Sequence, residues 1–396
     1  MAWVRPQYGK KKVDAAGEAL LIGIPRGRGS GVLIVDIQKY FAAVEVVNNW
    51  RAVHSYPLHA IKMTLKRRAK TIYPEAIIAQ RLKRLASIKL KLELSKAAGN
   101  HPNLSQMQDI GGCRAVMGTV SQVRRLERVF AEASKKSPHR GPQFDKITDY
   151  IANPKTSGYR GIHLIYRYRT DSTTHNCYNG QRIEIQLRSR LQHYWATAVE
   201  TYSTFSGEAL KSNIGSDRWK RFFALVSSCI ALQEKSPTVP GTPVSKDELE
   251  PELRLLYKEL NVENVLSGWS LVNKVLEDAD KKQASEASMY LLVLNPNVFH
   301  LDITPYKAGD LALANIEYAR VEKEKPELQA VLVSVDSLAS LRTAYPNYFF
   351  DTAGFIRFIK KFLNEPRRRV IPGMVPAIRA ELPTDGYVGK NLLSGE

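Results

Sequence analysis

The stretch HLIYRYRTDSTTHNCYNGQRIEIQLR, from His163 to Arg188, determines how the centre of this chain folds. Its two ends, HLIYRYR and QRIEIQLR, are rich in branched apolar and aromatic residues, and the polar segment between them contains Asn179-Gly180. Because Asn-Gly favours a tight turn between strands, the two ends are predicted to be neighbouring strands. In the second strand apolar residues alternate with Glu184, Gln186 and Arg188, so one face is apolar and the other is polar.

Helical and strand-like patterns alternate around this pair of strands. Residues 75–100 and residues 121–134 have helical spacing, and Ser121 is the expected N-cap of the second helix. A short apolar run at residues 113–118 predicts a strand between them, and residues 191–202 return to helical spacing. The sequence therefore predicts an α+β fold with a mixed sheet flanked by helices.

A proline-rich polar stretch at residues 237–252 predicts a linker between two domains. The first domain, residues 1–236, begins with a helical extension, and the second, residues 253–396, is expected to be a small α+β module. Within the second domain the sequence predicts helices near 253–282, 311–322 and 351–363, and strands at 290–294, 298–303 and 330–335.

The charge of the chain is strongly positive and unevenly distributed. The formal net charge is +19, and residues 1–240 contain 39 Lys and Arg but only 17 Asp and Glu. A basic half of this kind is typical of proteins that bind a polyphosphate or a nucleic acid. A basic surface that only keeps the protein soluble is the alternative, and the concentration of charge in one part of the chain makes it the weaker one.

Several classes of protein are not expected from this sequence. No apolar run approaches the roughly 20 residues that cross a bilayer, and the first residues lack the apolar segment of a secretory signal. The cysteines Cys113, Cys177 and Cys229 are few and widely spaced, which argues against a disulfide framework and against a CxxC zinc site. A cytoplasmic protein without a membrane partner is the expectation.

Two groups of residues suggest a triphosphate and its metal. The predicted helix of residues 75–100 carries cations and one serine that suit phosphate oxygens; these residues are Arg81, Lys83, Arg84, Ser87 and Lys91. Helical spacing places Arg84, Ser87 and Lys91 on one face. Asp109 follows a loop and precedes Gly-Gly-Cys-Arg114, where a carboxylate suits a divalent cation and an arginine suits a base or a phosphate. A solvated basic face and a simple turn-capping aspartate are the alternatives when each group is considered alone.

A third group lies in the segment DYIANPKTSGYRGIH, from Asp149 to His163. Proline and glycine shape it into a loop that presents Lys155, Tyr159, Arg160 and His163. An aromatic ring among cations can stack on a base while the cations neutralise phosphate. The polar row of Glu184 and Gln186 follows on the next strand; an edge strand exposed on one face would have the same pattern.

Together these motifs resemble the RelA/SpoT synthetase family over roughly residues 60–205, in the order RLKRLASIKLK, DIGGCR, DYIANPKTSGYRGIH and EIQLR. The resemblance implies a nucleotidyltransferase-like mixed sheet and an enzyme that moves the β,γ-pyrophosphate of ATP to a ribose 3′-hydroxyl. It also implies a role for each matching residue. Arg81 and Arg114 would sandwich adenine, and Lys83, Arg84, Ser87 and Lys91 would hold the ATP phosphates. Asp109 and Glu184 would hold Mg²⁺, and Glu184 would also act as the base. Tyr159 would stack on the acceptor base, and Lys155, Arg160, His163 and Gln186 would line the acceptor side.

Two features of the sequence bear on the identity of the acceptor. Family members that make alarmones usually have lysine where this chain has Thr148, and the lost cation argues against a guanosine di- or triphosphate. The segment NNWRAVHSYPL, residues 48–58, resembles the toxic small synthetases, and the whole chain resembles the CapRel type of fused toxin–antitoxin proteins. That resemblance implies transfer to the 3′ CCA end of tRNA, with basic residues following the acceptor stem. A small alarmone synthetase making ppGpp or ppApp, and a catalytically silent RNA-binding module, are the alternatives.

The same resemblance implies that the second domain is an antitoxin-like sensor with a zinc-finger-like shape that holds no metal. Tyr345 and Tyr348 would press into the ATP site and keep the enzyme inactive. Two tyrosines in a buried turn are the structural alternative. A phage major capsid protein would be the trigger that releases this clamp, so the resemblance implies a monomeric antiviral toxin that blocks translation.

Overall fold

The computed structural model describes most of the chain between residues 3 and 363. The described ranges are 3–22, 34–100, 103–136, 142–206, 216–266, 289–295, 300–307, 310–325, 328–334 and 352–363. Tyr345 and Tyr348 therefore lie outside the described residues.

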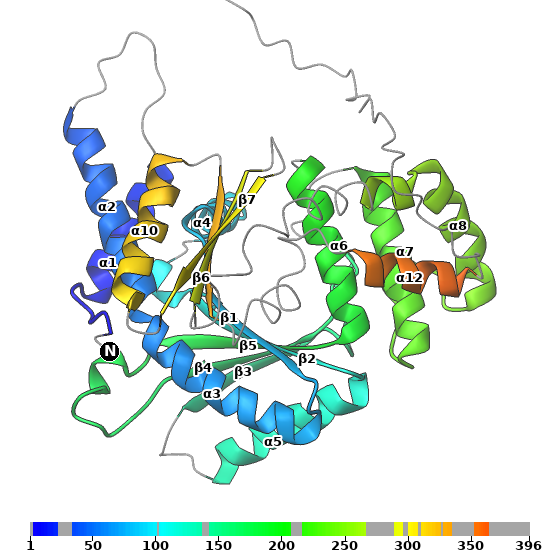
Figure 1. The fold of residues 1–396 in the computed structure, drawn as a ribbon, viewed down its shortest axis with the longest axis horizontal. Coiled ribbons are helices and arrows are strands. Elements are labelled where there is room, and N and C mark those ends of the chain that lie inside the picture. Colours follow the sequence, from blue (N-terminus) through cyan, green and yellow to red (C-terminus); the bar gives the residue numbers. More distant parts are fainter. Residues whose placement is uncertain are drawn as a thin grey trace, which may run out of the picture.

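One mixed sheet of eight strands organises the described part of the molecule (Figure 1). Its order is β3-β4-β5-β2-β1-β8-β6-β7; β2 and β5 run parallel, and every other neighbouring pair is antiparallel. The strands are β1 (Ile77–Leu82), β2 (Gly111–Met117), β3 (Gln143–Asp149), β4 (Ile162–Arg167), β5 (Arg182–Ser189), β6 (Met289–Asn295), β7 (His300–Tyr306) and β8 (Gln329–Ser334).

Two helices, α3 (Ser55–Ile72) and α5 (Val120–Lys136), cover one face of the strands β1 to β5 (Figure 1). The alternation in β5 explains the choice of face, because Ile183, Ile185 and Leu187 are fully buried in the core beneath these helices. The opposite, polar face of the same strands is therefore left for a site.

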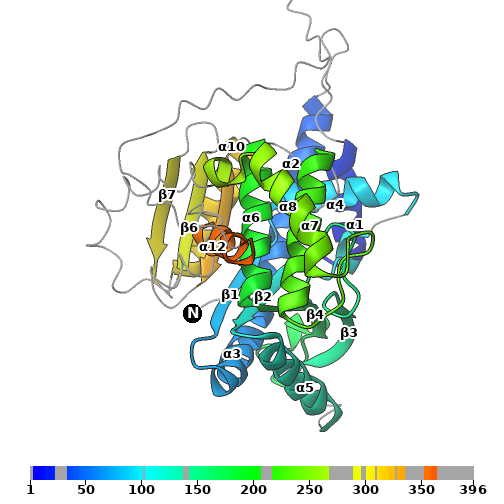
Figure 2. The ribbon, with the colours of Figure 1, turned by 90° about the vertical axis from the view of Figure 1, so that its right-hand side faces the viewer.

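Four helices pack into a second core at one side of the sheet (Figure 2). They are α6 (Arg190–Ser206), α7 (Asp217–Gln233), α8 (Lys246–Glu259) and α12 (Ala353–Phe362). Two buried aromatic residues of α7, Phe222 and Phe223, contact Phe355 of α12. This core thus joins residues from both halves of the sequence.

At the other side, α1 (Lys10–Ile22), α2 (Ile34–Val53) and α4 (Leu85–Ala97) share a third core, which includes the short 3-10 helix η1 (Leu104–Gln106). The helix α10 (Leu311–Glu324) packs against β6 and β8 and lies beside α2 (Figure 1). A 3-10 turn, η2 (Asn176–Tyr178), lies in the connection between β4 and β5.

Most of the predicted elements are confirmed, including the strand pair β4 and β5, the strand β2, the helix α6 and the strands β6 to β8. The predicted helix over residues 75–100 is wrong in its first half, because residues 77–82 form β1 and only residues 85–97 are helical. Pairing with β2 and β8 on both sides outweighs the helical spacing there. The N-cap of α5 is Thr119 rather than Ser121. Thr119 Oγ1 accepts a hydrogen bond from the amide of Gln122, and the amide of Thr119 donates to Gln122 Oε1.

The two halves of the predicted domain division share the sheet, because β8 pairs with β1 at Gln80↔Ser334 and Arg81↔Val333. The helix α8 begins at Lys246, inside the stretch predicted to be a linker, and Ser245 caps it by accepting a bond from the amide of Glu248. The domain boundaries at 236 and 253 stay a prediction. The part of the predicted helix 253–282 beyond residue 266 lies outside the described residues.

Within the described ranges, none of the helices combines the length and the apolar character that a membrane span requires. All three cysteines are free, and Cys113 and Cys229 are buried.

Candidate active site

The register of the strands gathers the predicted site residues on the polar face of the sheet. His163 of β4 pairs with Gln186 of β5, which in turn pairs with Arg114 of β2. Thr148 of β3 pairs with His163 on the other side. Directly paired residues of neighbouring strands point to the same face, so one row of side chains crosses four strands.

A second row lies one step along the same face. Glu184 of β5 pairs with Gly112 of β2, and Gly112 pairs with Arg81 of β1. A side chain at Gly112 would meet nothing closer than the carbonyl oxygen of Glu184 at 3.9 Å, so the missing side chain leaves open space between Glu184 and Arg81. Arg81 and Arg114 are diagonal neighbours across β1 and β2, a separation that long side chains can bridge.

These rows line a cavity of about 240 Å³. It combines five cationic side chains, three carboxylates and the rings of Tyr159, His163 and Trp195, so its walls suit a polyanion that carries a base. The cations are Arg81, Lys83, Arg114, Lys155 and Arg188, and the carboxylates are Asp109, Glu184 and Glu200.

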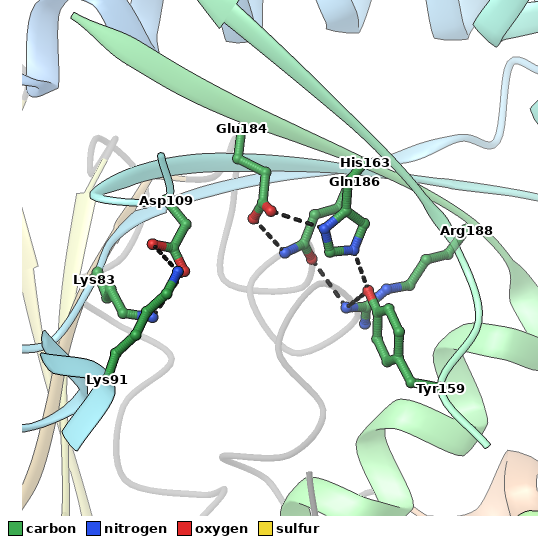
Figure 3. A network of polar contacts seen from close by, with 8 residues as sticks. All are labelled: Lys83, Lys91, Asp109, Tyr159, His163, Glu184, Gln186 and Arg188. Atoms are coloured by element: carbon green, nitrogen blue, oxygen red, sulfur yellow. Dashed lines mark hydrogen bonds and ion pairs between the residues drawn. The ribbon is translucent and has the colours of Figure 1, made fainter. Parts of the chain in front are cut away.

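At one end of the cavity Asp109 is held between two lysines. Lys83 Nζ lies 2.9 Å from Asp109 Oδ2, and Lys91 Nζ lies 2.9 Å from Oδ1 (Figure 3). Burial raises the pKa of Asp109, but the charges of Lys83 and Lys91 outweigh it and hold that pKa below its ordinary value. Burial lowers the pKa of Lys83, and the pairing with Asp109 only partly offsets it. The carboxylate is therefore kept ionised beside a surplus of positive charge.

At the other end, five side chains form a closed ring of polar contacts (Figure 3). His163 Nδ1 lies 2.8 Å from Glu184 Oε1, and Gln186 Nε2 donates to Glu184 Oε2 at 2.7 Å. Arg188 Nη2 donates to Gln186 Oε1 and to the Tyr159 hydroxyl, each at 2.9 Å. The Tyr159 hydroxyl and His163 Nε2, 2.6 Å apart, close the ring.

The ring orients Glu184. If His163 donates from Nδ1 to the carboxylate, its Nε2 accepts from the Tyr159 hydroxyl, and every member of the ring has a partner. Burial raises the pKa of Glu184, but the hydrogen bond that it accepts from His163 outweighs burial, so that pKa lies below its ordinary value. Burial raises the pKa of Tyr159, which keeps its hydroxyl protonated.

The loop before β4 presents Tyr159 through a glycine that no other residue could replace without strain. Gly158 has φ +89, and a side chain there would meet Trp195 and Ser227 at 3.0 Å. The Ser227 hydroxyl donates to the Gly158 carbonyl at 2.6 Å, which fastens the loop to α7. Lys155 Nζ lies 5.6 Å from the centroid of the Tyr159 ring.

Arg160 corrects the prediction that it lines the acceptor side. It is 2% exposed and points into the second core, where Nε donates to Ser227 Oγ at 2.9 Å and Nη2 donates to the Pro237 carbonyl at 2.6 Å. The loop from Asp149 to His163 presents several cationic and aromatic side chains close together, and sequence alone does not tell which of them turns into the core. Arg160 therefore stabilises the loop and does not face the cavity.

The remaining predicted residues divide into two groups. Nine of them line the cavity: Arg81, Lys83, Asp109, Arg114, Lys155, Tyr159, His163, Glu184 and Gln186. Lys91 reaches Asp109 from α4, whereas Arg84 and Ser87, at the start of α4, are not among the lining residues. Their predicted contacts to ATP phosphates stay a prediction.

Sequence reasoning assigned no role to Arg188, although it closes the ring and its guanidinium lies 5.1 Å from the centroid of the Tyr159 ring. The alternation of β5 contained the signal, because it places Arg188 on the same face as Glu184 and Gln186. Trp195 of α6, which lines the cavity, had no such signal.

The donor set fits a magnesium ion bound together with phosphates. Asp109 and Glu184 project into the same space, and the charge of Asp109 acts on the pKa of Glu184 (Figure 3). Among the described residues, no cluster of three or more His, Cys, Asp or Glu side chains could hold a metal alone. Mg²⁺ is usually bound by one or two carboxylates plus substrate phosphates, and Asp109 and Glu184 are two carboxylates that line one cavity.

Residues 80–206 match the family described as the region found in RelA / SpoT proteins. This chain carries a RelA/SpoT region. The match begins in β1 and ends with α6, so it contains every residue that lines the cavity except Ala79. The finer resemblance to CapRel stays a prediction.

Two curated relatives share part of this RelA/SpoT region. The GTP pyrophosphokinase YwaC of Bacillus subtilis (strain 168) is 30% identical over 91 residues, which is 23% of this chain and 40% of the relative. The GTP pyrophosphokinase YjbM of the same organism is 31% identical over 130 residues, or 31% of this chain and 54% of the relative. The chain thus spans about half or less of the length of these relatives.

Two solved structures match part of this chain with low TM-scores. The small alarmone synthetase 1 of Bacillus subtilis superposes with a TM-score of 0.37 at 22% identity, covering 47% of this chain and 91% of that one. The same enzyme bound to its product pppGpp gives a TM-score of 0.38 at 22% identity, covering 48% of this chain and 94% of that one.

Proposed function

We propose that this protein is an ATP-dependent pyrophosphotransferase that acts on a ribose 3′-hydroxyl. The observation that supports the proposal most is the meeting of Asp109 and Glu184 in one cavity with five cationic side chains. Transfer of a pyrophosphoryl group needs positioning and neutralisation of charge more than covalent chemistry from the protein. The match of residues 80–206 to the RelA/SpoT region adds to this support.

The donor nucleotide would lie over β1 and β2. Arg81 and Arg114 would enclose the adenine from two neighbouring strands, and Lys83 and Lys91 would bind the phosphates. Mg²⁺ bound by Asp109 and Glu184 would screen the negative charge of the phosphates. Each lysine would then exchange its bond to Asp109 for a bond to a phosphate oxygen.

Glu184 would take the proton of the attacking hydroxyl. The acceptor oxygen bonds to the β-phosphorus, the bond between that phosphorus and the α–β bridging oxygen breaks, and AMP leaves with that oxygen. The low pKa of Glu184 keeps it ionised and ready to accept a hydrogen bond from the hydroxyl, and Gln186 and His163 fix its orientation. Tyr159 would stack on the acceptor base, in competition with the cations that lie over its ring.

The first candidate acceptor is the 3′ CCA end of tRNA. Thr148 pairs with His163, so a lysine at this position would point toward the acceptor side of the cavity. The chain lacks that cation, which favours an acceptor without terminal phosphates near its reacting ribose. The basic residues predicted to follow the acceptor stem include Lys66, Arg67, Arg68 and Lys70. These four lie on α3, which covers the opposite face of the sheet, so they do not support this acceptor.

The second candidate acceptor is a free nucleotide, such as GDP, GTP or an adenine nucleotide. The printed names of both curated relatives favour it, because each is called a GTP pyrophosphokinase. Arg188 and Lys155 beside Tyr159 are cations that could bind its phosphates. In this case the protein is a small alarmone synthetase that makes ppGpp or ppApp.

The proposal includes a regulatory role for the C-terminal half, as an antitoxin-like sensor of zinc-finger-like shape without metal. Tyr345 and Tyr348 would inhibit the site, and a phage major capsid protein would release it in an antiviral, cytoplasmic and monomeric protein. The pairing of β8 with β1 next to Arg81 supports communication between this half and the donor site.

Transfer from ATP labelled on its γ-phosphate tests the proposal and separates the acceptors. The full chain is incubated with Mg²⁺, labelled ATP and either bulk tRNA or GDP, as wild type and with Tyr345 and Tyr348 both changed to Ala. Label on tRNA supports the first acceptor, and label on a nucleotide supports the second. Labelling of neither acceptor by either protein would reject the enzyme and leave the RNA-binding module.

A further inference from the structure

A buried polar cluster at the turn between β1 and α4 joins three parts of the chain that are far apart in sequence. Its centre is Arg51, in the last turn of α2, whose side chain is 3% exposed. Its Nη1 donates to Glu322 Oε2 of α10 and its Nη2 to the Tyr318 hydroxyl, at 2.7 and 2.6 Å. Its Nε donates to the carbonyl oxygen of Lys83 at 2.9 Å.

Glu322 completes the cluster from the C-terminal half. Its side chain is 9% exposed, and both of its oxygens have partners. Oε2 accepts from Arg51, and Oε1 accepts from the backbone amide of Leu85 at 2.9 Å and from the Tyr318 hydroxyl at 3.1 Å. A buried carboxylate bonded in this way is fixed in position.

The two bonds to the backbone hold the turn between β1 and α4 from behind. Arg51 binds the carbonyl of Lys83 and Glu322 binds the amide of Leu85, so Arg84 lies between two anchored positions. The amide of Lys83 is also bonded, to the Ile110 carbonyl at 2.8 Å, next to Asp109. This turn therefore determines where Lys83 and the first turn of α4 point.

Glu322 also supplies the missing cap of α4. Arg84 occupies the N-cap position without a side-chain bond to the helix, and such an end leaves backbone amides without partners inside the helix. A carboxylate at this end is favoured by the helix dipole as well. The cap of a helix that carries Lys91 thus comes from an element 237 residues further along the chain.

We infer that Arg51 and Glu322 are positioning residues for the ATP phosphates, through which the C-terminal half keeps the donor site assembled. That the ligand is ATP rests on the proposed function. The link from Arg51 and Glu322 to the Lys83–Leu85 turn consists of hydrogen bonds and does not depend on the ligand. Loss of the hydrogen bond between the Leu85 amide and the Glu322 carboxylate would free the Lys83–Leu85 turn and misplace Lys83 and Lys91. It would weaken ATP binding and leave the acceptor side, more than one strand away, unchanged.

The substitution Glu322→Gln tests the link, because it keeps the size of the side chain and removes the charge that pairs with Arg51. Its matched control is Glu317→Gln, the same change on the same helix, at an exposed pair with Arg320. Binding of α,β-methylene-ATP is measured by calorimetry on the full chain in which Tyr345 and Tyr348 are both changed to Ala, and hydrogen exchange is followed in the peptide that contains Leu85. We expect the dissociation constant of Glu322→Gln to rise on the order of 10-fold, since small misplacements of binding groups are costly. The Leu85 amide should exchange faster, and Glu317→Gln should match the wild type in both measurements.

Tyr318→Phe is the second variant, needed if Glu322→Gln does not fold. It removes the hydroxyl that bridges Arg51 and Glu322 and keeps the ring whose centroid lies 4.8 Å from the Arg51 guanidinium. We expect a smaller loss of affinity and faster exchange at Leu85. Unchanged exchange at Leu85 in a folded variant overturns the link, whether or not ATP binds. If the chain with Tyr345 and Tyr348 both changed to Ala binds no ATP analogue, while exchange at Leu85 still depends on Glu322, the proposed function is rejected instead.

Discussion

At one end of the cavity Asp109 is held between two lysines, whereas at the other end Glu184 belongs to a ring made mostly of neutral donors and acceptors. Both carboxylates have pKa values below the ordinary value, for different reasons. Asp109 is kept ionised by ion pairs with two lysines, and Glu184 mainly by a hydrogen bond from one histidine. A buried carboxylate can thus be kept ionised by neighbouring cations or by a largely neutral network of hydrogen bonds.

The two arrangements suit different tasks. Lysines are flexible point charges, so the Asp109 end can rearrange around phosphates of varied geometry. The ring around Glu184 leaves few free directions, which suits a group that must meet one hydroxyl at one angle. We therefore expect changes at the Asp109 end to affect donor affinity and changes at the Glu184 end to affect the rate of transfer.

The largest effect is expected for Glu184→Gln. Because the amide cannot take a proton from the acceptor, we expect kcat to fall by roughly 10³-fold while the analogue α,β-methylene-ATP is still bound. Initial rates of transfer and calorimetry measure the two quantities. Glu132→Gln, an exposed change on α5 at the far face of the sheet, should leave both unchanged. A variant with normal kcat would remove Glu184 from the role of base.

Lys91→Met comes next and tests the other end. Loss of one charged bond to phosphate should raise the KM for ATP by roughly 10-fold or more and change kcat less. The control is Lys89→Met on the same helix, where Lys89 faces Glu93 instead of the cavity. If kcat fell while the KM stayed constant, the division of tasks between the two ends would be wrong.

A smaller effect is expected for Thr148→Lys, which adds a cation opposite His163. We expect kcat/KM for GDP, relative to that for tRNA, to increase about 3- to 10-fold, since one added charge near phosphates gains on the order of 1 kcal/mol. Thr71→Lys adds the same charge on α3, on the other side of the sheet, and should not change the ratio. An equal shift in both variants would show a general effect of charge.

The smallest effect on transfer at neutral pH is expected for His54→Gln. His54 bears on the pH dependence of stability, and a loss of folded protein in acid must be separated from a loss of activity in the cavity. His54 is 1% exposed, and burial lowers its pKa to about 4, although its ring bonds to the Trp50 carbonyl. The unfolded chain binds the proton at a pKa of about 6.5, so folding stability is complete above that pH and is lost as the pH falls toward the folded pKa.

Between pH 7 and pH 5 this linkage should cost the wild type about 2 kcal/mol of unfolding free energy, measured with urea. In His54→Gln that part of the pH dependence should disappear, and His175→Gln, at a half-exposed ring, should retain it. An identical pH dependence in wild type and His54→Gln would mean that another group causes the acid loss.

The polar face of the sheet could be predicted because its signal is local. Alternation in residues 182–188 is enough to place Glu184 and Gln186 together, and the loop that ends at His163 adjoins them on the next strand. The convergence of Asp109 with these residues was expected only from the family resemblance. It follows physically from the parallel pairing of β2 with β5, which links segments about 70 residues apart.

The errors arise where distant contacts overrule local pattern. Residues 77–82 have helical spacing, yet strands on both sides convert them to β1. The inward turn of Arg160 depends on acceptors in α7 and at Pro237. The bonds of Arg51 and Glu322 join residues 271 positions apart, and no sequence pattern connects them.

The pairing of β8 with β1 has a consequence for how this protein can be divided. If the chain were cut after residue 236, β1 would become an outer strand with unpaired amide and carbonyl groups, and an open edge of this kind recruits other chains. Arg51 would at the same time lose the carboxylate with which it pairs. A shortened protein should therefore tend to aggregate, and low solubility of such a fragment would reflect the exposed strand instead of toxicity.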